Sequence, residues 1–137
     1  MSDPRNPVDA FGLPPSIEDI AAMAERALAD IPPHLLAHAT DVGVTVEDRA
    51  DDETLKEMRL ESPWDLAGLY RGVPLTQRSV LDPARQPDRI FIYREAILLE
   101  WVETRDDLYC LVRNVVVHEI AHHFGFSDDD IAAIERE

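Results

Sequence analysis

The sequence has a single cysteine, no long hydrophobic run and few basic side chains, and each scarcity excludes a class of protein. Cys110 has no second cysteine to pair with, so an internal disulfide is excluded and nothing indicates an oxidising compartment. No apolar run of about 18 residues occurs, so we expect no transmembrane helix. Residues 1–16 lack the charged and apolar regions of a secretory signal. We therefore expect a cytoplasmic protein without a membrane partner.

Basic side chains are outnumbered by acidic ones, 13 against 28, and the formal net charge is -15. Nucleic acids and anionic membranes would repel such a chain, so we expect neither as a partner. About 45% of the 137 residues are hydrophobic, which is enough for one modest core.

The chain divides into an arm and one domain. Residues 1–15 are rich in proline and show little periodicity, which predicts a flexible N-terminal arm. Ser16 and Asp19 have the spacing of a capping box, so a helix is expected to begin there. We expect residues 16–137 to form a single domain.

The remaining elements follow from hydrophobic periodicity. Val42, Val44 and Val46 alternate with polar residues, as in a half-buried strand. Pro74 predicts that the second strand lies at a sheet edge. The mixed order of elements predicts an α+β fold. Strands are expected within 41–48, 66–76 and 89–93, and helices within 16–31, 51–60, 94–103, 104–124 and 128–137.

The helix at 104–124 has predicted start and stop signals. Thr104 with Asp107 reads as a capping box. Gly125 suits the left-handed position just past a helix end. Cys110, near the start of this helix, is expected to be a small buried apolar residue.

This helix carries the stretch VVVHEIAHH. At about 100° per residue, His118 and His122 lie about 40° apart on one face and can meet the same ion. Neighbours such as Val115 are apolar, so two histidines there require a polar partner, and a zinc ion is one. Glu119 points about 100° from His118, beside the ion, where a carboxylate can accept a proton from water. The alternative is that His118, Glu119 and His122 form an ordinary hydrogen-bonded cluster in the helix and bind no metal.

Catalytic zinc needs a third protein ligand and an open coordination position. Gly125 lets the chain turn sharply, and Asp128 follows the first histidine by ten residues. Asp128 is the predicted third ligand and Asp129 its main rival. Asp128 can also be interpreted as a helix-stabilising residue. Ser127 and Asp130 have the spacing of a capping box for the last helix, and a carboxylate near a helix N-terminus stabilises the helix.

Two nearby polar residues have weaker claims. His123 faces about 140° from His118 and is expected to be structural or on the surface. Asn114, one turn before His118, could contact the site from the second layer of residues, but packed asparagines are more common.

Other polar side chains are open to two readings as well. Tyr70, Tyr93 and Arg71 could stabilise an oxyanion or could be packing and surface groups. His34 and His38 repeat the four-residue spacing without a glutamate, so we interpret them as solvent-facing.

The string HEIAHHFGFSD resembles HExxHxxGxxD, the signature of zincin metallopeptidases that use an aspartate as third zinc ligand. The wider sequence is similar to a family of very small bacterial zincin-like proteins. The segments LAGLYRGVPLTQRS, PDRIFIYREAI and VRNVVVHEIAHHFGFSDDDI carry that similarity, which covers residues 15–137.

The resemblance implies a minimal zincin domain, with a short mixed sheet packed on an active-site helix. By position it implies one Zn²⁺ held by His118, His122 and Asp128, with Glu119 as general base. Other divalent first-row ions would suit the same ligand set. Longer zincins carry a methionine turn after the motif, whereas the methionines here all precede it. The floor of the site must therefore be built from other residues than a methionine turn, and the substrate cleft must be small or shared with a partner. A homodimer is one possible partner arrangement.

These inferences predict a zinc-dependent metallopeptidase acting on a peptide or protein. An extended substrate would pair with the edge strand at Leu69, Tyr70, Arg71 and Val73 by β-augmentation. The alternative is a zincin-like module that binds metal or peptide with little or no turnover.

Overall fold

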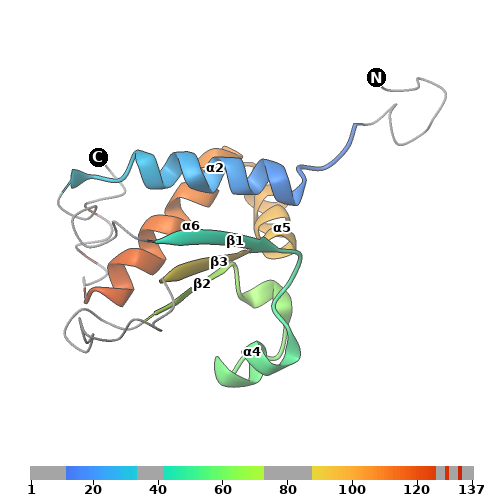
Figure 1. Ribbon diagram of the computed structural model, residues 1–137. Coiled ribbons are helices and arrows are strands. Elements are labelled where there is room, and N and C mark those ends of the chain that lie inside the picture. Colours follow the sequence, from blue (N-terminus) through green and yellow to red (C-terminus); the bar gives the residue numbers. More distant parts are fainter. Residues whose placement is uncertain (1–11, 34–41, 73–87, 126–128, 130–132, 134–137) are drawn as a thin grey trace.

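The computed structural model describes residues 12–33, 42–72, 88–125, 129 and 133. Its centre is a three-stranded sheet in the order β1-β3-β2. The described helices surround this sheet (Figure 1), so the α+β prediction is confirmed. The elements are β1 (Gly43–Glu47), β2 (Gly68–Arg71), β3 (Arg89–Tyr93), α2 (Ile17–Ala29), α4 (Asp52–Glu57), the 3-10 turn η1 (Pro63–Asp65), α5 (Arg94–Thr104) and α6 (Leu108–His123).

The sheet is mixed. β3 lies in the middle, parallel to β1 and antiparallel to β2. A parallel pair cannot be joined by a tight hairpin, and the chain between β1 and β3 contains α4, η1 and β2. The predicted interior strand and edge strand are thus confirmed as β3 and β2.

One face of the sheet packs against α2 and α6 (Figure 1). Ile90 and Ile92 of β3 are fully buried there, and the alternating valines of β1 pack against the same cluster. Alternation places the odd-numbered β3 residues on the other face, where Tyr93 joins a smaller cluster. Leu55 of α4, Leu66, Leu69 and Ala96 belong to that second cluster.

The start of α2 follows the sequence signal. The Ser16 hydroxyl accepts a hydrogen bond from the Asp19 backbone N–H, and the Asp19 carboxylate accepts one from Ser16 N–H. These bonds hold the pKa of the Asp19 carboxyl below its usual value. The predicted capping box is confirmed.

The predicted capping box before α6 is wrong. α5 continues through Thr104 and ends at Arg105, which has a left-handed φ of 61°. Asp107 is itself the N-cap of α6, and its side chain accepts from Cys110 N–H. Thr104 instead accepts from the N–H of Asp106. Thr104 lies in the last turn of α5, three residues before the N-cap of α6, and so cannot cap α6.

Cys110 is exposed, so its predicted burial is also wrong. The inward face of α6 at this level is formed by Leu108, Leu111 and Val112, and Cys110 lies outside it. Gly125 has φ 85°, as predicted for the position beyond the helix end.

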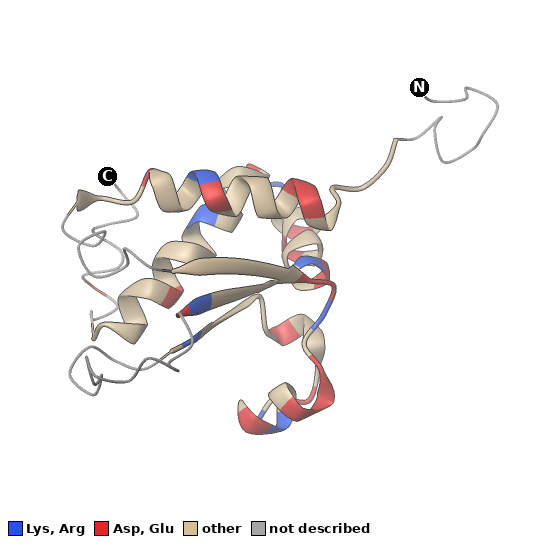
Figure 2. Cartoon of the chain, in the orientation of Figure 1, with Lys and Arg blue, Asp and Glu red and all other residues tan. Residues whose placement is uncertain are grey.

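Acidic positions are spread over α2, α4 and α5 rather than gathered on one element (Figure 2). Within the described ranges, no helix is long and apolar enough to cross a membrane. Residues 1–11 of the predicted arm, and His34 and His38, lie outside the described part of the chain.

Candidate active site

The helix that carries the histidines is fixed by its own buried face. Val112, Val116 and Ile120 are fully buried between the sheet and α2. His118 lies beside this face and is half-buried, whereas His122 is exposed. The helix therefore holds the two imidazoles at the border between the core and solvent.

The two imidazoles lie side by side. The ring centroids of His118 and His122 are 4.3 Å apart, with the planes tilted by 48°. Neutral imidazole nitrogens are good zinc donors, and two on one helical face fit a shared ion. The donor chemistry and the placement of this pair therefore fit zinc.

The predicted third ligand, Asp128, lies outside the described residues. Its rival Asp129 is described and exposed. Among the described residues, no three histidine, cysteine, aspartate or glutamate side chains form a group able to hold a metal ion. Ligation by Asp128 stays a prediction.

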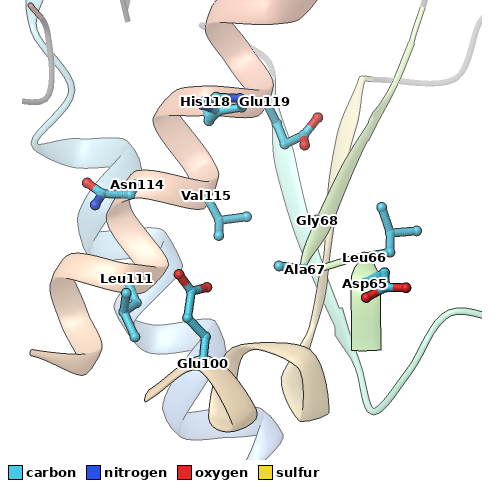
Figure 3. Close-up of a pocket in the computed structure, with 10 residues that line it drawn as sticks. All are labelled: Asp65, Leu66, Ala67, Gly68, Glu100, Leu111, Asn114, Val115, His118 and Glu119. Carbon is cyan, nitrogen blue, oxygen red and sulfur yellow. The ribbon is translucent and has the colours of Figure 1, made fainter. Parts of the chain in front are cut away.

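Glu119 reaches from α6 towards β2 (Figure 3). Its carboxylate accepts a hydrogen bond from the backbone N–H of Tyr70. Burial raises the pKa of the Glu119 carboxyl, and the Tyr70 N–H and nearby His122 partly oppose that rise. The candidate base is thus removed from bulk water and oriented by a strand.

The register of the sheet explains why this N–H is available. Tyr93 N–H donates to Ala67 O, so these two residues form a hydrogen-bonded pair. In an antiparallel ladder such pairs alternate with non-bonded ones. Gly68 and Tyr70 are opposite Ile92 and Ile90 in non-bonded pairs, so their backbone groups point away from β3. Glu119 binds at this edge of β2, the outer one among the described strands.

The edge strand can approach the helix because Gly68 has no side chain. A Cβ atom at Gly68 would collide with Cγ1 of Val115 and would also contact the Glu119 side chain. The glycine therefore brings the outer edge of β2 within reach of the carboxylate.

The Tyr70 side chain is anchored on both sides. Its hydroxyl donates to Oδ2 of Asp88 at 2.6 Å, and Asp88 is only 3% exposed. Its ring stacks on His123 with centroids 3.9 Å apart. His123 thus packs against the strand that orients Glu119, which agrees with the structural role predicted for it.

Asp88 was missed by sequence reasoning. It precedes the apolar run of β3 in a stretch that reads as a loop, and no motif spacing marks it. Only the pairing of β2 with β3 brings Asp88 to Tyr70, because Tyr70 is opposite Ile90 in the register.

The other candidate residues of β2 and β3 point elsewhere. The side chain of Leu69 is buried in the second cluster. Arg71 forms an ion pair with Glu57 at 2.6 Å on the face of the sheet opposite α6. Tyr93 lies on that face as well and is 2% exposed. The side chains of Arg71 and Tyr93 are therefore separated by the sheet from Glu119. Val73 lies outside the described residues.

A cleft of about 300 Å³ opens beside Glu119 between α6 and the start of β2 (Figure 3). One wall is formed by successive turns of α6, the opposite wall by residues 65–68, and Glu100 of α5 lies at one end. Asn114 lines this cleft from α6. The cleft is where a substrate group next to Glu119 can be held.

A comparison with known protein families identifies the family of the chain. The sequence model of a family described as zincin-like metallopeptidases matches residues 39–137, which span the sheet, α5 and α6. No curated protein matches the chain.

Proposed function

The chain belongs to the zincin-like metallopeptidase family, and on this premise we propose that it hydrolyses peptide bonds with Glu119 as general base. One observation carries the proposal beyond the family: Glu119, beside the histidine pair, is half-buried and held by a backbone N–H at the outer edge of β2. That placement joins a base, a candidate metal pair and a strand edge able to receive a peptide.

We propose His118, His122 and Asp128 as the residues that would hold one Zn²⁺. When bound, the ion would acidify water and polarise the scissile carbonyl. Glu119 would accept the proton of the attacking water and pass it to the leaving amine. Burial that raises the pKa of this carboxyl favours both steps, since an effective acid–base group has a pKa near the working pH.

The outer edge of β2 supports an extended substrate. Gly68 directs its backbone groups away from β3, so a peptide laid along this edge would pair with Gly68, while the Tyr70 N–H holds Glu119. Specificity then comes from side chains that enter pockets beside the strand.

The competing function is a binding module that holds metal or peptide with little turnover. It is favoured by the position of the methionines in this sequence, Met1, Met23 and Met58, which all precede the motif. Retention of Glu119 favours catalysis, because a pure binding site has no need of a base.

Metal analysis followed by a peptide-library cleavage assay separates the two functions. The expected result is one zinc per chain, with cleavage that Glu119→Gln reduces by about 10² or more while zinc content is unchanged. Glu103→Gln alters an exposed carboxylate of α5 and serves as the matched control. Stoichiometric zinc without Glu119-dependent cleavage would favour the binding module, and no zinc uptake at neutral pH would contradict both the zinc peptidase and a metal-binding module.

A further inference from the structure

We infer that the cleft beside Glu119 is a subsite for a lysine or arginine side chain next to the scissile bond. This inference rests on the proposed peptidase function and names its substrate class. It depends on the shape of the cleft, on the order of apolar and acidic groups along it, and on the charge of its lining.

The cleft follows α6 away from the reacting end. His118 and Glu119 lie at one level, and Val115 and Leu111 follow on the preceding turns (Figure 3). With a rise of about 1.5 Å per residue, the distance along the helix from His118 to Leu111 is about 10 Å. A long side chain entering beside Glu119 would therefore run over aliphatic groups before it reaches the far end.

The far end is acidic. Glu100 extends from α5 towards Val115 in Figure 3, and Asp65 lies at the strand side of the same cleft. With Glu119, three carboxylic residues line one cleft of about 300 Å³, and its lining contains no lysine or arginine. The charge of this lining favours a cation over an anion.

These carboxylates differ from the acidic groups that are already paired with arginines. Glu57, Glu95 and Asp48 each form an ion pair with an arginine. Within the described residues, neither Asp65 nor Glu100 pairs with a basic side chain. Two unpaired carboxylates facing one cleft are therefore positioned to receive a cationic group from outside the chain.

A basic side chain matches both parts of the lining. Lysine and arginine lay an aliphatic stem along apolar surface and keep the charged head at a polar rim. Val115 and Leu111 suit the stem, and Asp65 and Glu100 suit the head. A free peptide α-amine is also a cation, but it has no stem to cover the aliphatic wall between Glu119 and the carboxylates.

The first test is turnover of fluorogenic peptides that differ only at the residues flanking the scissile bond. Zinc-loaded protein should cleave the lysine or arginine peptide about tenfold faster in kcat/KM than the norleucine peptide, the neutral isostere. Asp65→Asn and Glu100→Gln should each reduce this ratio several-fold, and Glu100→Lys should favour a glutamate peptide. Glu103→Gln is the control and should leave the ratio unchanged. Cleavage of the norleucine peptide should be the same in the Asn and Gln variants, which excludes a general loss of fold.

The second test is binding without turnover. Zinc-loaded Glu119→Gln protein would be titrated with labelled lysine and norleucine peptides and followed by fluorescence anisotropy. The lysine peptide should bind about tenfold more tightly, and adding Glu100→Gln should remove most of that difference. If no peptide is cleaved in a Glu119-dependent way, the proposed peptidase function fails, whereas this binding difference still decides the subsite.

Three results would overturn the subsite. A preference for norleucine that Glu100→Gln leaves unchanged would assign the cleft to apolar side chains. Loss of cleavage on acetylation of the peptide N-terminus would show that the cation is an α-amine. Equal binding of the lysine and norleucine peptides would show that the carboxylates do not contact the substrate.

Discussion

Gly68 faces Val115 so closely that the glycine hydrogen occupies the position where any larger residue would meet the valine methyl group. This contact joins β2 to α6 at the level of Glu119. It connects the packing of the fold to the placement of the candidate base, because the Tyr70 N–H that holds Glu119 is two residues further along the same strand.

Gly68→Ala should therefore lower both stability and turnover. The added methyl group forces β2 and α6 apart, and overpacking of this kind costs about 1–3 kcal/mol. For a domain of this size, that corresponds to a fall of several degrees in the thermal midpoint. The double variant Gly68→Ala/Val115→Ala should recover part of both losses, since the colliding methyl group is gone. A fully stable, fully active Gly68→Ala would contradict the close contact.

Tyr70→Phe should destabilise the protein more than Tyr109→Phe. Tyr70 donates to the buried carboxylate of Asp88, and loss of a hydrogen bond to a buried charged acceptor costs about 1–3 kcal/mol. Tyr109 donates to the exposed Asp30 at 2.9 Å, where water can replace the hydroxyl. Urea denaturation of both variants measures the difference. Equal losses would mean that the burial of Asp88 does not matter.

Zinc should stabilise the protein through the histidine pair. A ligand that binds only the folded chain contributes about 2.7 kcal/mol when its free concentration is 100 times its Kd. His118→Ala and His122→Ala should abolish the zinc-dependent rise in thermal midpoint, and so should a chelator. His123→Ala removes the ring stacked on Tyr70 and should keep the rise.

The same assay identifies the third ligand. Asp128→Ala should reduce the zinc-dependent rise strongly, whereas Asp129→Ala should leave it near the unmodified value. Coordination by three protein ligands with one open position is the arrangement expected of catalytic zinc. The reverse order of the two variants would assign the ligand to Asp129.

Asp107→Ala should cost more stability than Thr104→Ala. Asp107 caps the first turn of α6 through Cys110 N–H, and loss of an N-cap side chain costs about 0.5–2 kcal/mol. Thr104 binds only the N–H of Asp106 between the two helices. Thermal unfolding of the two variants should rank them in this order. The opposite order would restore Thr104 as the cap.

The secondary structure was predictable because its signals are local. The alternating valines of β1, the capping box at Ser16 and the stop at Gly125 each act through neighbouring residues. The error at Thr104 arose because two overlapping caps share one short connection, and only the end of α5 decides between them.

The site was only partly predictable. His118, Glu119 and His122 share a helical face, which spacing alone reveals. The contacts that orient Glu119 join residues distant in sequence, and they depend on how β2 pairs with β3 and packs on α6. No pattern within a single segment reports that pairing, so the role of the Tyr70 backbone and of Asp88 emerged only with the fold.

α6 contributes five fully buried core residues as well as the histidine pair. A nascent chain that ends before residue 108 lacks α6 and leaves the inner surfaces of α2, β2 and β3 exposed to water, since α6 packs on all three. Completion of the core therefore places the histidine pair in the same step.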